Sequence, residues 1–197
     1  MKKLARALFD RDIGKTLAIS LFYALCWSMF IYAYQPFAAK ALLLTPQEIA
    51  INFTVFGIAG LLSQAFAVSR LVKMFGEKKV LFGSLVFMTV SFILFSKVTS
   101  FSMLMAVSLF HAFGNSLVSP LVQALLSKEA DESSQGSILG INASYMSIGM
   151  IFGPIIGGIL ATNQIQLPFI GGAVLAFVCA VFAYKILSTP HLHQVKI

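Results

Sequence analysis

Four polar side chains share one face of a predicted helix inside an apolar run at residues 101–126. His111 lies near the middle of this run and is the only residue of the apolar runs that titrates near neutral pH. At helical spacing it shares its face with Ser108, Asn115 and Ser119. A polar face inside an apolar segment must contact protein or water. The pattern predicts either hydrogen bonds to neighbouring helices or a substrate cavity, with His111 as the candidate for proton coupling.

An aromatic stripe runs along the apolar segment 16–37. Its members recur at helical spacing and are Tyr23, Trp27, Phe30 and Tyr34. Large rigid rings can stack on lipophilic or cationic compounds. Such rings also serve in helix packing or in the aromatic belt at a membrane surface. The stripe therefore predicts a wall of a substrate cavity, with packing as the alternative.

The acidic residues are informative because carboxylates within a membrane mark ion and proton pathways. All seven lie in loops or at predicted helix ends: Asp10, Asp12, Glu48, Glu77, Glu129, Asp131 and Glu132. We expect no carboxylate at the bilayer midplane, and no proton coupling through a buried Asp or Glu of this chain. The two cysteines show neither a disulfide framework nor the spacing of a metal site. No metal and no cofactor is expected.

The elements that carry these residues are predicted to be membrane-spanning helices. Of 197 residues, 58% are hydrophobic and 11% are charged, and the mean hydropathy is +0.90. This composition is typical of an integral membrane protein in contact with the lipid bilayer. Because membrane proteins gather Lys and Arg in cytoplasmic loops, the net charge of +7 does not make nucleic acid an expected partner. Apolar runs of sufficient length predict an all-α protein with six transmembrane helices, at residues 16–37, 46–71, 80–96, 101–126, 136–161 and 167–187.

The charged residues outside the spans predict the orientation. Residues 1–15 are expected to form a cytoplasmic amphipathic segment, residues 16–188 the transmembrane domain, and residues 189–197 a cytoplasmic tail. If every span crosses, 12 of the 14 Lys and Arg lie on one side, and Lys40 and Lys97 lie on the other. The positive-inside rule then predicts a multi-pass protein of the cell membrane with both termini in the cytoplasm.

The span at 136–161 carries a glycine motif, which consists of Gly140, Gly149, Gly153, Pro154, Gly157 and Gly158. Glycine at every fourth residue from Gly149 to Gly157 leaves one helix face without side chains, so another helix can approach to backbone contact. Pro154 removes a backbone donor and is expected to bend or weaken the helix. The motif predicts a close-packed span whose smooth face needs a partner.

The spacing of this motif resembles the glycine-proline motif of antiporters in the major facilitator superfamily. Residues 69–82, SRLVKMFGEKKVLF, are similar to the family's cytoplasmic loop between the second and third helices of a half, and they retain Arg70, Gly76, Lys78 and Lys79. Ser69 and Lys73 stand where that loop has a glycine and an acid, which is typical of the loop in a C-terminal half. Pro120 and the segment QALLSKEADESSQG are similar to the junction of the tenth and eleventh helices of drug:proton antiporters.

The resemblance covers nearly the whole chain and implies the C-terminal six-helix half of a twelve-helix secondary transporter. By this resemblance, the first and fourth spans line the central cavity, and the second and fifth spans contact the other half through their glycine-rich faces. The implied function is export of small lipophilic or cationic compounds by alternating access. The implied partner is a second six-helix half, either another copy of the chain in a homodimer or a separate N-terminal half.

Other classes of membrane protein agree less well with the sequence. A non-transporting scaffold, or an inactive fragment of a twelve-helix transporter, is the main alternative. An intramembrane serine protease needs its serine and histidine on different spans, whereas Ser116 and His111 lie on the same one. A pore is disfavoured because the sequence has neither a repeated asparagine-proline-alanine signature nor a ring of charge. The prediction is a transporter and not an enzyme.

Overall fold

The computed structural model describes residues 13–130 and 134–188, and all regular structure within these ranges is helical. Six helices are long and apolar enough to cross a membrane, which confirms the predicted all-α fold. A short π-helix, η1 (Phe37–Ala41), continues the first of them. Most of the predicted amphipathic segment 1–15 and all of the predicted tail 189–197 lie outside the described residues. The helices are α2 (Ile13–Pro36), α3 (Pro46–Phe75), α4 (Glu77–Phe95), α5 (Phe101–Glu129), α6 (Gln135–Asn163) and α7 (Leu167–Leu187).

Local signals in the sequence explain where the helices begin and end. Thr45 caps α3 through a capping box: its Oγ1 accepts from the Glu48 N–H at 3.3 Å, and Glu48 Oε2 accepts from the Thr45 N–H at 2.8 Å. Pro46 occupies the first turn, where its missing N–H costs nothing. Gly76 alone joins α3 to α4, and its φ of 81° lies in the region that favours glycine.

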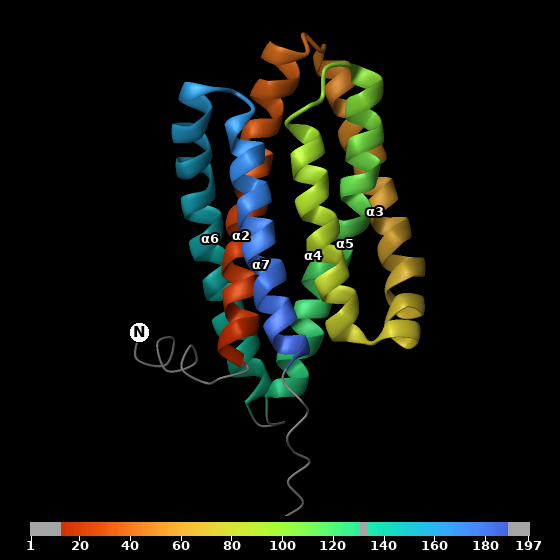
Figure 1. Ribbon diagram of the computed structural model, residues 1–197, viewed down its shortest axis with the longest axis vertical. Coiled ribbons are helices and arrows are strands. Elements are labelled where there is room, and N and C mark those ends of the chain that lie inside the picture. The colour runs from red at the N-terminus through yellow and green to blue at the C-terminus, as the bar shows by residue number, and fades with distance from the viewer. Residues whose placement is uncertain (1–12, 131–133, 189–197) are drawn as a thin grey trace, which may run out of the picture.

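The six helices pack side by side, and successive helices run in opposite directions (Figure 1). The central helix is α2, which packs on α6 and α7 and also contacts α5. Helix α4 packs on α7 and α5, whereas α3 packs mainly on α5 and lies at one edge of the bundle (Figure 1). Asn52 is the one buried residue of α3. The core therefore forms around α2, α4, α5 and α7.

The smooth glycine face of α6 packs against α2 of the same chain. A Cβ added at Gly149 would lie 2.5 Å from the Leu21 carbonyl oxygen, and one at Gly153 would overlap the Ser28 hydroxyl. At Gly157 it would lie 2.9 Å from Met29 Cγ. The two backbones are close enough for Ser28 Oγ to donate a hydrogen bond to the Gly149 carbonyl oxygen at 3.1 Å. We call this contact the glycine seam.

The glycine seam corrects the expectation that the glycine-rich face of the fifth span contacts another half, because α2 already occupies that face. Gly140 does not belong to the seam: it is exposed, and nothing lies within 4 Å of an added Cβ. Nine residues separate it from Gly149, which is about two and a half turns, so it points to the opposite side of α6. Gly158 lies beside the Tyr32 ring, and Pro154 lies within α6, which continues through it.

Candidate functional site

His111 of α5 lies inside the bundle, enclosed by aromatic rings from three other helices. Its side chain is fully buried. The nearest ring centroids are those of Phe92, at 4.8 Å, and Phe30, at 5.0 Å. Two further rings stack on the imidazole with interplanar angles of 10° and 25°. We call this the aromatic enclosure; its members come from α2, α3 and α4 and are Trp27, Phe30, Phe56, Phe92 and Phe95.

A serine on α4 fixes the orientation of the imidazole. Ser91 Oγ lies 2.6 Å from His111 Nδ1 and 2.7 Å from the Met88 carbonyl oxygen. The carbonyl can only accept, so the single hydroxyl hydrogen of Ser91 is donated to Met88. Nδ1 then carries its own hydrogen and donates it to Ser91 Oγ. In this neutral tautomer His111 Nε2 is an acceptor, and it has no hydrogen-bond partner among the described residues.

The aromatic stripe of α2 and the polar stripe of α5 face each other. Tyr23 donates its hydroxyl hydrogen to Asn115 Oδ1 at 3.1 Å, and Trp27 and Phe30 lie against His111 as described above. The stripe of α2 is packed, not open: Phe30 is 2% exposed. The structure thus joins the two predicted sets, and in this closed arrangement they form part of the core.

Three predicted residues lie at the margins of this contact. Tyr34 donates to Asn52 Oδ1 of α3 at 2.6 Å, which explains why Asn52 is buried. Ser108 Oγ is buried and, like His111 Nε2, has no hydrogen-bond partner in the described part of the chain. Ser119 accepts a hydrogen bond from Gln123 Nε2 of its own helix at 3.2 Å and takes no part in the enclosure.

The unpartnered atoms indicate what the enclosure can do. Buried polar atoms are nearly always hydrogen-bonded, and leaving one unpaired costs about 1–3 kcal/mol. His111 Nε2 can accept from an N–H or O–H group, and Ser108 Oγ can donate or accept. The surrounding rings can stack on apolar or cationic groups. The arrangement can therefore bind a small apolar molecule that carries one hydrogen-bond donor.

Sequence reasoning missed the contribution of α4 and α3 to this enclosure. Ser91, Phe92 and Phe95 lie in an ordinary apolar span, and Phe56 is one of 19 phenylalanines in the chain. A single serine within such a run is the one signal available, since a polar group in a span must find a partner. Which partner it finds depends on how the helices pack.

The basic loop lies at the end of the bundle where α3 meets α4. Arg70 is exposed, Gly76 forms the tight link, and Lys78 Nζ donates to the Ile186 carbonyl oxygen at 3.4 Å, which ties α4 to α7. Lys79 is exposed. Lys73, which stands at the acid position of the loop motif, is exposed as well.

Two acidic side chains make the remaining polar contacts at this end. Glu77 pairs with Lys128 at 2.7 Å. Glu129 Oε2 accepts from the Thr16 hydroxyl at 3.0 Å, which joins α5 to α2.

Comparison with known proteins gives relatives of one kind. Residues 16–196 match the family model described as Major Facilitator Superfamily. Multidrug resistance protein 1 of Bacillus subtilis is 35% identical over 125 residues, which are 64% of this chain and 32% of the relative. Quinolone resistance protein NorA of Staphylococcus aureus is 29% identical over 168 residues, 85% of this chain and 42% of the relative. The tetracycline resistance protein, class C, of Escherichia coli is 31% identical over 135 residues, 66% of this chain and 34% of the relative.

The family match covers most of the chain, whereas the matched part covers less than half the length of these curated relatives. Six apolar helices, packed as one bundle, agree with half of the family's fold. The resemblance noted in the sequence is thereby confirmed, and the chain belongs to the major facilitator superfamily.

Proposed function

We propose that the chain is one half of a secondary transporter that exports small lipophilic or cationic compounds by alternating access. The observation that carries the proposal is the aromatic enclosure around His111, with Nε2 free to accept a hydrogen bond. The relatives whose names refer to multidrug, quinolone and tetracycline resistance support a substrate of this kind. Tyr23, Trp27, Phe30, Tyr34, Ser108 and Asn115 are proposed to contact the substrate, and the position of Ser119 gives it a secondary role.

Substrate entry requires the enclosure to open, and α3 is the helix proposed to move. Phe56 of α3 stacks on His111 at a centroid distance of 6.0 Å. Apart from Asn52, no residue of α3 is buried. Little apolar contact is lost when such an edge helix shifts, so its displacement would expose the imidazole at low cost.

We further propose His111 as the proton-coupling group. Its neighbours on α2, α3 and α4 are Ser91 and the five rings of the aromatic enclosure, and none of them is charged. A neutral imidazole suits this closed surrounding, whereas an imidazolium would lose its hydration without gaining a counter-ion. Protonation is therefore expected to accompany opening, which would couple proton uptake to the conformational change.

The second half of the transporter is proposed to pack on the outer faces of α3 and α6. Both faces are apolar and exposed; on α6 they include Ile151, Ile155 and Ile159. The partner is either another copy of the chain, related by an axis along the membrane normal, or a separate N-terminal half. Mass measurement in mild detergent distinguishes them, because a monomer alone would contradict the homodimer.

The orientation is proposed from the charges. Within the described residues, the basic side chains lie mainly at the end of the bundle that holds Gly76 and Lys128, and Lys40 and Lys97 lie at the other end. The positive-inside rule places the Gly76 end, and with it both termini, in the cytoplasm of a cell-membrane protein. Labelling of Lys97→Cys, but not Lys128→Cys, by an impermeant maleimide in intact cells would support this orientation.

The decisive experiment measures transport in liposomes that contain the purified chain. A fluorescent lipophilic cation is followed under a pH gradient with the wild type, with His111→Ala, and with the matched control Leu109→Ala on the exposed side of α5. We expect movement with the wild type and the control, and loss of movement with His111→Ala. Equal movement with His111→Ala would refute the role of this residue.

Absence of movement with every variant would refute a self-sufficient homodimer and favour dependence on a separate half. A dye that also leaves Trp27 fluorescence unchanged would favour the alternative, a non-transporting scaffold or an inactive fragment.

A further inference from the structure

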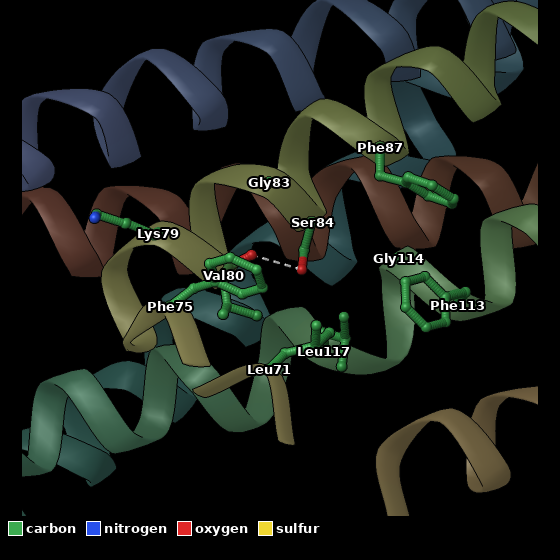
Figure 2. A pocket seen from close by; sticks show the side chains of 10 residues that line it. All are labelled: Leu71, Phe75, Lys79, Val80, Gly83, Ser84, Phe87, Phe113, Gly114 and Leu117. Carbon is green, nitrogen blue, oxygen red and sulfur yellow. Dashed lines mark hydrogen bonds between the residues drawn. The ribbon is translucent and has the colours of Figure 1, made fainter. Parts of the chain in front are cut away.

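A pocket separate from the aromatic enclosure opens between α3, α4 and α5. Its volume is about 280 Å³, just below the ~300–1,000 Å³ of typical small-molecule sites. Apart from Lys79 and Ser84, its lining residues are apolar or glycine, and they are Leu71, Phe75, Val80, Gly83, Phe87, Phe113, Gly114 and Leu117. Ser84 donates its hydroxyl hydrogen to the Val80 carbonyl oxygen at 2.8 Å and asks for no ligand (Figure 2).

The pocket exists because α3 and α4 diverge around α5. They are joined by Gly76 alone, yet they contact each other little, and both pack on α5. Gly83 leaves the wall open at α4, since nothing lies within 4 Å of an added Cβ. The wall residues belong to helices that span the membrane, so the pocket faces acyl chains rather than water.

The charge at the pocket is positive. Lys79 lies at one end, with its ammonium directed away from the phenyl rings of Phe87 and Phe113 (Figure 2). No carboxylate lines the pocket, and Glu77, the acid nearest in sequence, is paired with Lys128 at 2.7 Å. A cationic compound would be repelled from this end, whereas an anionic headgroup would be attracted.

We propose that this pocket binds an anionic phospholipid, with one acyl chain between α3 and α4 and the headgroup phosphate paired with Lys79. The apolar wall and the single cation at its end match the two parts of such a lipid. Arg70 and Lys73, exposed at the same end of the bundle, add to the attraction without lining the pocket. The site is independent of the enclosure around His111 and of which end of the bundle is cytoplasmic.

The test uses a tryptophan at the pocket and brominated lipids as quenchers. Phe75→Trp in a Trp27→Phe background places the only indole at the pocket wall. The full chain is reconstituted in phosphatidylcholine vesicles that contain equal bromine as acyl-brominated phosphatidylglycerol or as acyl-brominated phosphatidylcholine. Because one lysine near a membrane surface contributes about a fivefold preference for anionic lipid, phosphatidylglycerol should quench at about fivefold lower mole fraction.

Two matched pairs of variants locate the effect. Lys79→Gln removes the charge at the pocket, and Lys73→Gln removes one from the same end outside it. Gly83→Leu fills the pocket, and Gly57→Leu adds the same side chain at an open position of α3. We expect Lys79→Gln and Gly83→Leu to abolish the preference, and both controls to retain it.

Each opposite result overturns the proposal. Equal quenching by the two lipids in the parent chain means that no anionic lipid is selected. Equal loss with Lys73→Gln and Lys79→Gln means general surface charge, and a preference that survives Gly83→Leu means that no acyl chain enters. Fluorescence insensitive to both lipids means that protein, such as a second copy of the chain, covers the pocket.

Discussion

Substitution of Gly153 by alanine tests the glycine seam. The added Cβ would overlap the Ser28 hydroxyl and would also lie 2.7 Å from the Leu25 carbonyl oxygen and 2.9 Å from the Met29 nitrogen. The hydroxyl can rotate away, but the two backbone atoms belong to α2 and cannot move alone. The helices must separate, which weakens the hydrogen bond from Ser28 to the Gly149 carbonyl.

The expected cost follows from the price of overpacking a filled core, which is about 1–3 kcal/mol. For a chain of this size, 1 kcal/mol corresponds to roughly 2–4 °C in Tm, so Gly153→Ala should lower Tm by roughly 2–12 °C. Gly140→Ala, on the same helix with nothing within 4 Å of its Cβ, is the matched control. There the helix propensity of alanine should leave Tm unchanged or raise it slightly.

The assay is thermal unfolding of the purified chain in mild detergent, followed by circular dichroism. The double variant Ser28→Gly with Gly153→Ala should recover only part of the loss, because the contacts with the α2 backbone remain. Equal Tm values for Gly153→Ala and Gly140→Ala would refute the reasoning, since the seam could then accept a side chain.

Two further substitutions test the hydrogen bonds of the core. Ser91→Ala should lower the free energy of unfolding by about 1–3 kcal/mol because it leaves His111 Nδ1 buried and unpaired; Ser96→Ala, at an end of α4, should have little effect, and equal Tm values would contradict the assignment. Tyr34→Phe removes the donor to Asn52 Oδ1 and should cost about 0.6 kcal/mol, the average for such bonds between membrane helices; a double-mutant cycle with Asn52→Ala measures this coupling, and a zero value would refute it.

The spans could be predicted from the sequence because hydropathy is a local property of each segment. The cap at Thr45 and the link at Gly76 were equally visible, since both depend on a few neighbouring residues. The stripes of α2 and α5 were identified as helix faces, and the structure places these faces against each other.

The partners across the bundle could not be predicted in the same way. The spacing of Gly149, Gly153 and Gly157 predicts a smooth face, but any helix with small residues can occupy such a face. In the structure α2 occupies it, and the resemblance had suggested another half. Likewise, nothing local connects Ser91 to His111, because their contact depends on the packing of α4 against α5.

The glycine seam also has a consequence for biosynthesis. The residues that form its hydrogen bond, Ser28 and Gly149, are 121 positions apart in the chain. At a synthesis rate of about 5–20 residues per second, α2 enters the membrane on the order of ten seconds before α6 is made. During that interval the Ser28 hydroxyl can bond only within its own helix, to the Leu25 carbonyl. The central helix of the bundle is therefore among the last to complete its contacts, and a nascent chain that stops before α6 exposes the bare side of α2 to lipid.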